Sequence, residues 1–219
     1  AIIYTNKIEI VSAIDKVTPF TLPSDLSYLL ISSKKLAKTP RAQTGLDRYK
    51  AYRSSSQGGS FKTEIVYVDD IYDQFGYGIP NHPHTFKNFA HYLKENYLNL
   101  EYVLLVGKGR EYQTVRTKER LEQPSNQTFF IPTYGTSPSD ILLFSKGEEA
   151  VPFFALGRIA AKNGDDINNY LDKVIEHDLA KEAPQTLDKM WLKNVIHLGG
   201  GGNNGEQSAI RRFLEQMGD

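Results

Sequence analysis

The residues with the clearest chemical pattern lie near the end of the 219-residue chain, in a glycine-rich loop. Gly200, Gly202 and Gly205 have the spacing G-x-G-x-x-G within the stretch GGGGNNG. A buried strand is predicted before the loop, at 194–198, and an amphipathic helix after it, at 208–217. Strand, glycine loop and helix together are the context of a dinucleotide-binding fingerprint, in which backbone N–H groups at the helix start hold a pyrophosphate. The pattern therefore raises a nucleotide-binding hypothesis.

Other details of the same loop argue against a nucleotide. The run of consecutive glycines makes the loop more flexible than the fingerprint requires. The fingerprint belongs to the first strand–helix turn of its fold, whereas several such units precede this loop, and the expected acid about 20 residues later would fall beyond Asp219. We therefore interpret Gly200, Gly202 and Asn203 as part of a mobile loop at the carboxyl edge of a sheet, where open α/β folds bind ligands, and keep nucleotide binding as an alternative.

A second pair of glycines flanks Lys108, directly after a predicted strand at 102–106. Gly107, Lys108 and Gly109 could hold a phosphate or another ligand. No helix pattern follows them, however, and the spacing does not match a Walker A loop. A tight turn at the strand end is the favoured interpretation, with the ligand role left open.

Carboxylates and histidines are the residues that could bind a metal. Asp69 and Asp73 follow another predicted strand, and Asp140 lies in a turn-rich segment. Hard oxygen ligands suit Ca²⁺, although turn capping explains the same three residues, so they are weak calcium candidates and no other cofactor is expected. His84 and His91 do not have the spacing of a zinc site and are interpreted as solvated histidines of a helix face.

Composition excludes several classes of chemistry. The chain has no cysteine, so it contains no thiol nucleophile, no thiolate metal ligand and no disulfide. Its formal net charge is zero, which gives no overall attraction to nucleic acid or to an anionic membrane surface. No apolar run approaches the roughly 20 residues of a membrane span. An arginine at the end of a predicted strand, Arg158, could anchor a carboxylate or hold two lobes together, and its spacing does not decide between them.

The elements that must position these residues alternate between strand and helix. The predicted strands lie at 28–32, 64–68 and 102–106, and the predicted helices at 41–53, at 84–97 and from about 163 to 179, with a loop at 69–83. This alternation predicts an α/β fold with a mostly parallel sheet covered on both faces. Short strands without helices at 129–131, 141–144 and 153–156 indicate an antiparallel excursion or a lobe boundary. We therefore divide the chain into an extended segment at 1–18, a first α/β lobe at 19–128 and the start of a second, incomplete lobe at 129–219.

Several of these segments carry a family pattern in a fixed order. VYVDDIYD (66–73) and FGYG (75–78) resemble the segment V-x-D-I-Y-D-x-F-x-x-G, and YVLLVG (102–107) resembles a central strand. IPTY (131–134), SD (139–140), LGRIAA (156–161) and YLDKVI (170–175) resemble a stretch that closes with G-R-I and a helix. The ordered set resembles the gingipain-type cysteine peptidases of family C25, a caspase-like clan found in secreted and surface proteins of Bacteroidetes-type bacteria.

The resemblance implies a caspase/gingipain-like three-layer sandwich with its first lobe complete and its second partial. It also implies a polypeptide substrate and a secreted, cell-surface or outer-membrane location. The family's catalytic His and Cys, in which the Cys thiolate attacks the scissile carbonyl, are expected after the Gly199–Gly205 region. No catalytic residue can therefore be assigned within this chain, and His197 precedes the expected site. The family often has G-D-G where this chain has Gly107-Lys108-Gly109, which puts a metal-binding role of that loop in doubt.

The leading hypothesis is a part of a gingipain-like cysteine endopeptidase domain that is inactive by itself and works with the remainder of its parent chain. The first alternative is a non-catalytic structural or interaction lobe. The second alternative is a nucleotide-binding enzyme that uses Gly200–Gly205. Neither nucleic acid nor a membrane span is expected, and the sequence gives no prediction of the oligomeric state.

Overall fold

The computed structural model describes residues 17, 19–37, 44–109, 129–135, 137–147, 149, 151–182, 185–196 and 199–218. The chain divides into two compact units between Ile175 and Glu176. The predicted extended segment at 1–18 lies outside the described residues except for Val17.

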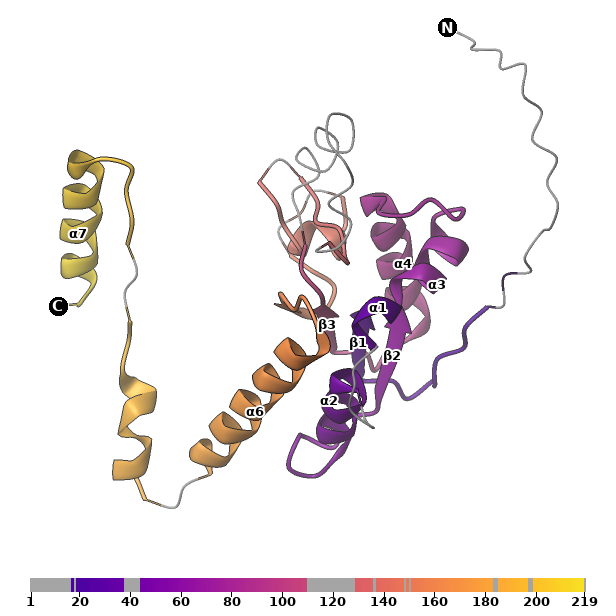
Figure 1. The fold of residues 1–219 in the computed structure, drawn as a ribbon, viewed down its shortest axis with the longest axis horizontal. Helices are drawn as coiled ribbons and strands as arrows, with labels where there is room; N and C mark the ends of the chain where they lie inside the picture. Colours follow the sequence, from indigo (N-terminus) through magenta and orange to yellow (C-terminus); the bar gives the residue numbers. More distant parts are fainter. Residues whose placement is uncertain are drawn as a thin grey trace, which may run out of the picture. The chain divides into compact units, whose positions relative to one another are not determined.

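A parallel sheet forms the centre of the first unit (Figure 1). Its strands are β1 (Tyr28–Ser32), β2 (Thr63–Tyr67), β3 (Tyr102–Val106) and β4 (Ala155–Ile159), in the order β2-β1-β3-β4. Leu30 of β1 lies opposite Ile65 on one side and Leu104 on the other, and all neighbouring strands are parallel. All five residues of β1 are buried, the continuous burial that a strand with both faces covered requires.

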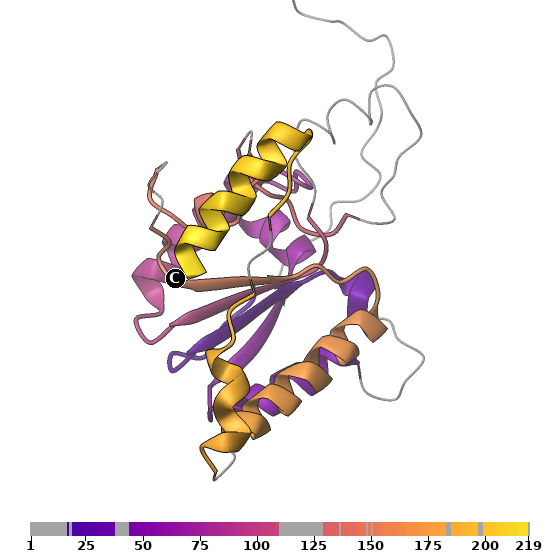
Figure 2. The same cartoon turned by 90° about the vertical axis from the view of Figure 1, so that its left-hand side faces the viewer.

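Helices cover both faces of this sheet (Figure 2). On one face α2 (Gly45–Ser54) packs against α6 (Gly164–Lys181), since Arg48 donates to Asn168 and Asp172. On the other face lie α3 (Val68–Phe75) and α4 (Pro83–Asn96), and the short α1 (Lys34–Ala37) follows β1 directly. Helix α4 starts with a proline in its first turn and buries an apolar stripe at helical spacing: Phe86, Phe89, Ala90 and Leu93.

The α/β fold with a parallel sheet is confirmed. The strands predicted at 28–32 and 102–106 have these bounds, and the helix predicted at 84–97 differs from α4 by one residue at each end. The loop predicted at 69–83 was wrong in its first part, because Val68, Ile71 and Tyr72 form a buried helical face in α3.

The segment predicted to be rich in short strands also needs correction. Residues 129–131 form no strand, and Ile141–Leu143 form a 3₁₀ helix, η1. Two isolated antiparallel bridges, Tyr134 with Ser139 and Ser145 with Pro152, give this segment its antiparallel character. The strand predicted at 153–156 begins only at Ala155 and joins the parallel sheet as β4. The lobe division at residue 129 stays a prediction.

The second unit contains the end of α6, a 3₁₀ helix η2 (Leu187–Lys193) and α7 (Asn204–Gly218). None of its residues whose burial the structure describes is buried. The strand predicted at 194–198 is not formed over Asn194–Ile196, where Val195 and Ile196 are exposed, and its other residues lie outside the described part. No helix within the described ranges is long and apolar enough to cross a membrane.

Candidate functional site

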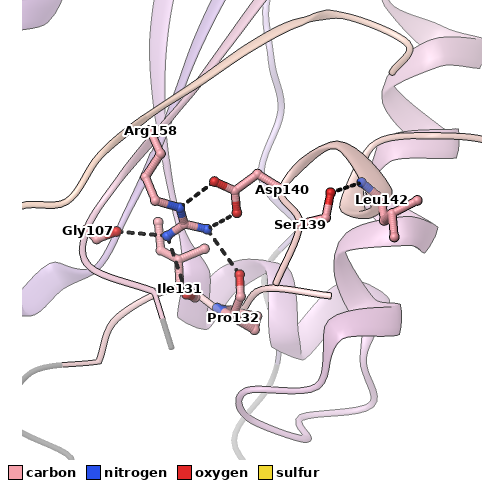
Figure 3. Close-up of polar contacts among 7 residues, drawn as sticks. All are labelled: Gly107, Ile131, Pro132, Ser139, Asp140, Leu142 and Arg158. Carbon is pink, nitrogen blue, oxygen red and sulfur yellow. Dashed lines mark hydrogen bonds and ion pairs between the residues drawn. The ribbon is translucent and has the colours of Figure 1, made fainter. Parts of the chain in front are cut away.

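An extensive polar cluster among the described residues of the first unit lies at the carboxyl edge of its sheet and centres on Arg158 of β4 (Figure 3). Arg158 Nε donates to Asp140 Oδ2 at 2.7 Å, and Arg158 Nη2 donates to Asp140 Oδ1 at 2.7 Å. The Arg158 side chain is 12% exposed and the Asp140 side chain 26%. This is a bidentate, largely desolvated ion pair, the geometry that a planar guanidinium forms best.

The guanidinium also binds three backbone oxygens. Arg158 Nη1 donates to the carbonyl of Gly107 at 2.8 Å and to that of Ile131 at 3.4 Å, and Nη2 donates to that of Pro132 at 3.1 Å. One side chain thereby holds together the end of β3, the segment at 131–132 and the turn at Asp140. We call these five residues, Gly107, Ile131, Pro132, Asp140 and Arg158, the Arg158 clamp. Arg158 thus anchors the carboxylate of Asp140, and within the first unit it also joins Gly107 to a segment that lies after the predicted lobe division at residue 129.

The two glycines around Lys108 are required by close packing against this clamp. Gly107 has φ +148°, and a Cβ there would lie 2.9 Å from Phe130 Cβ. A Cβ on Gly109 would lie 2.8 Å from Thr133 Cγ2 and 3.1 Å from Arg158 Nη1. The main chain after β3 stays beside the segment that follows β4, since Lys108 N donates to the carbonyl of Ala161 at 2.9 Å. These contacts agree with the tight strand-end turn.

The segment that carries Asp140 is also attached to α4. Lys87 Nζ lies 4.2 Å from the centre of the Tyr134 ring and donates to the carbonyl of Gly147. The His84 ring meets the Tyr134 ring edge-on, with centres 5.6 Å apart. The exposed histidines of α4 thus contact aromatic side chains, since His91 meets Phe153 in the same way at 5.0 Å.

The calcium candidates are not brought together. Asp140 is paired with Arg158, whereas Asp69 and Asp73 lie on α3, beside Asp70, which accepts a hydrogen bond from Lys34 at 2.8 Å. That hydrogen bond raises the pKa of Lys34, and the charges of Asp69 and Asp73 act in the same direction. Across the described ranges, no three His, Asp or Glu side chains form a group that could hold a metal. Calcium binding at Asp69, Asp73 or Asp140 stays a prediction.

The glycine loop of the second unit is stabilised by its own side chains. Asn203 Oδ1 accepts from Glu206 N at 3.0 Å, and Glu206 Oε2 accepts from Gly202 N at 2.8 Å. This reciprocal capping places a carboxylate at the backbone N–H groups that a pyrophosphate would need, and its charge repels phosphate. The geometry therefore favours helix capping, and nucleotide binding at Gly200–Gly205 stays an untested alternative. His197 lies outside the described residues.

The model of Peptidase family C25 matches residues 21–218. The chain belongs to peptidase family C25. The predicted family is thereby confirmed, and membership supports a gingipain-like peptidase domain.

Among solved structures, the chain is similar to the crystal structure of dimeric latent PorU from Porphyromonas gingivalis, with a TM-score of 0.51 and 18% sequence identity. The match covers 80% of this chain and 17% of the PorU chain. This likeness supports the gingipain-like α/β fold, and the chain spans only a small part of the PorU chain's length. None of the curated proteins matches the chain.

Sequence reasoning missed the partners of Arg158 for a physical reason. Asp140 was considered as a metal ligand or a turn cap and not as the partner of Arg158, because nothing in its spacing from Arg158 signals a pair. The remaining acceptors are backbone oxygens of Gly107, Ile131 and Pro132. Every residue has such an oxygen, so the residue types do not indicate which ones bind Arg158.

Proposed function

We propose that the chain is part of a gingipain-like cysteine endopeptidase domain that acts on polypeptides. The observation that carries this proposal is the family match over residues 21–218. In this function the first unit supplies the scaffold and one side of the substrate cleft. Open α/β sheets bind ligands outside the carboxyl ends of their strands, and the Arg158 clamp fixes the chain segments at that edge.

The chain by itself hydrolyses no peptide. Cysteine peptidases need a thiolate to attack the scissile carbonyl, and the 219 residues contain no cysteine. In this proposal the chain helps to position the polypeptide substrate, and other residues of the parent protein supply the nucleophilic cysteine and its histidine.

The test is to incubate the purified chain with fluorogenic peptides that contain Arg or Lys, with and without prior treatment with iodoacetamide. We expect no turnover above that of a sample without the protein. A contaminating cysteine peptidase would lose its activity on alkylation, whereas this chain has no thiol to alkylate. Turnover that resists iodoacetamide and elutes with the chain on repurification would overturn the inactivity.

A longer form of the parent protein separates the enzyme from the non-catalytic alternative. We expect it to supply a His and a Cys after Asp219 and to hydrolyse peptides, with activity lost on alkylation and on replacement of that Cys by Ala. A parent protein with no such pair, and with no turnover, would support the structural or interaction lobe.

The proposal extends to location, which we place outside the cell or on its surface by analogy with gingipain-type peptidases. An antibody against the chain should detect the parent protein in the culture medium or on intact cells. Detection confined to the cytoplasmic fraction would contradict this location.

A further inference from the structure

The order of the strands marks one point at the carboxyl edge of the sheet. The chain leaves β1 for β2 on one side, and it leaves β3 for β4 on the other, so the order reverses between β1 and β3. In open α/β sheets, ligands bind outside the strand ends at such a topological switch point. The segments that follow these two strands are Ser33–Ala37 and Gly107–Gly109.

These two segments lie against each other. Ser32 Oγ donates to the carbonyl of Val106 at 2.8 Å, which joins the two strand ends. Leu36 Cδ1 lies 3.3 Å from the position that a Cβ on Gly107 would take. The turn at 107–109 therefore stands at the switch point itself.

The backbone of Lys108 is held on both sides. Lys108 N donates to Ala161 at 2.9 Å, and the Lys108 carbonyl accepts from Phe130 N at 3.0 Å. Gly107 and Gly109 have no room for a side chain. The side chain of Lys108 is thus the one chemical group that this turn presents, from a fixed backbone.

The charge of Lys108 has no partner in the part of the chain that the structure describes. Two acids at the ends of other strands and turns of this edge are engaged elsewhere: Asp140 uses both carboxylate oxygens on Arg158, and Asp70 accepts from Lys34. Lys108 is partly exposed, and none of the ion pairs among the described residues includes it. A cationic side chain that forms no ion pair with the described residues, at an edge where open α/β sheets bind ligands, favours an anionic group on the ligand.

We infer that Lys108 is a specificity-determining residue that binds an acidic side chain, Asp or Glu, of the polypeptide substrate. The inference rests on the proposed function, because it assigns the ligand of this edge to a polypeptide. The neighbouring Arg158 is not available for the same purpose, since its donors are taken up by the clamp.

The experiment measures binding to the whole 219-residue chain, since the chain is expected to be inactive by itself. Two fluorescently labelled peptides with blocked ends differ only in one central residue, Glu or Gln, and fluorescence anisotropy gives the dissociation constant of each. We expect the Glu peptide to bind about fivefold more tightly, the upper range for a partly screened ion pair. Lys108→Gln removes this preference, and Lys108→Glu shifts it to a third peptide with Lys at the same position.

The matched control is Lys62→Gln, which removes an exposed lysine just before β2, at the opposite edge of the sheet. It should leave the fivefold preference unchanged. Two results would overturn the role of Lys108: a preference for the Glu peptide that persists in Lys108→Gln, or equal affinity of the unaltered chain for the Glu and Gln peptides. Either result would still show that the chain binds peptides. No binding of any of the three peptides overturns both the role of Lys108 and the placement of the cleft, and hydrolysis by the longer parent protein still tests the peptidase function separately.

Discussion

Two glycine loops with similar spacing behave differently in this chain. Gly107 and Gly109 surround Lys108 in the first unit, where any Cβ would collide with Phe130 or Thr133. In the second unit, a Cβ on Gly200 would meet nothing within 4 Å. Both glycines of the first loop are required by the space that neighbouring groups occupy. In the second loop a Cβ on Gly199 or Gly201 would also meet Ile210 or Gln207, but no neighbour requires the glycine at position 200.

The polar groups of the two loops differ in the same way. At the first loop, one partly buried guanidinium binds backbone oxygens from segments far apart in the sequence. At the second, Asn203 and Glu206 bond only to residues within four positions of themselves. The first loop is therefore held by tertiary contacts and the second by a local helix cap, although the second has the better-known sequence motif.

The largest effect should come from Arg158→Ala in the first unit. It leaves Asp140 without its partner and removes the donor of three carbonyls, and breaking a largely buried ion pair costs up to about 3 kcal/mol. Urea unfolding of the chain measures this loss. The control is Arg211→Ala, whose pair with Glu215 is exposed at both ends and should contribute less than about 0.5 kcal/mol. Equal losses in the two variants would contradict a tertiary role for the clamp.

A smaller effect should separate Gly107 of the first loop from Gly200 of the second. Gly107→Ala places a methyl group 2.9 Å from Phe130 Cβ at a φ of +148°, and such overpacking costs about 2 kcal/mol. Gly200→Ala has open space and should change the free energy of unfolding by less than about 0.5 kcal/mol. The melting temperatures of the two variants, each compared with that of the unaltered chain, test this difference. A neutral Gly107→Ala would show that the first loop has room that the structure does not.

The third prediction concerns the tyrosines that only the first unit buries. Burial raises the pKa of Tyr28 and Tyr72 in the folded state. Above about pH 10 the unfolded chain loses these protons while the folded chain keeps them, so stability falls as pH rises through that value. Tyr72→Phe should reduce the loss between pH 10 and 11 by about 1 kcal/mol, as measured by urea unfolding at each pH.

The control for this prediction is Tyr77→Phe, since Tyr77 is 94% exposed. It should leave the pH dependence unchanged. An identical alkaline loss in the Tyr72→Phe variant and the unaltered chain would show that Tyr72 is not buried as described. Each variant is compared with its own stability at pH 7, because Tyr72 also forms a hydrogen bond to Asn81.

The smallest effect should come from the cap of α7. Asn203→Ala removes the acceptor of the Glu206 amide and should cost about 0.5 kcal/mol, the low end for caps of exposed helices. Hydrogen exchange at the first turn of α7 should become about twofold faster. Asn204→Ala, one position along, has no such acceptor role and should leave the exchange rate unchanged. Faster exchange in both variants would argue against a specific cap.

In the first unit, the elements that could be predicted are those with a clear pattern of apolar residues. The apolar runs at 28–32 and 102–106 define β1 and β3, and the stripe from Phe86 to Leu93 defines α4. Helix α3 was missed because its acidic residues and the nearby glycines and prolines indicate a loop, while its buried face is only Val68, Ile71 and Tyr72. The segment at 194–196 was wrongly assigned to a strand, because an apolar run does not by itself provide a neighbouring strand for pairing.

The candidate site was only partly predictable. Arg158 could be singled out from its position at a strand end, as could the glycines beside Lys108. The clamp itself could not, because most of its acceptors are main-chain carbonyls whose positions depend on the folded chain. The family resemblance supplied what spacing could not, namely that these segments belong to one peptidase fold.

Hydrogen exchange of the whole chain, with and without Arg158→Lys, tests the contrast between the two loops most directly. We predict slow exchange at the amides of Gly107, Lys108 and Phe130, which all donate to backbone oxygens, and fast exchange at Gly200. In Arg158→Lys, which keeps the charge but loses the planar fork, exchange should accelerate at the first three amides and stay unchanged at Gly200. Unchanged protection at Gly107, Lys108 and Phe130 in the variant would contradict the claim that Arg158 holds the carboxyl edge of the sheet together.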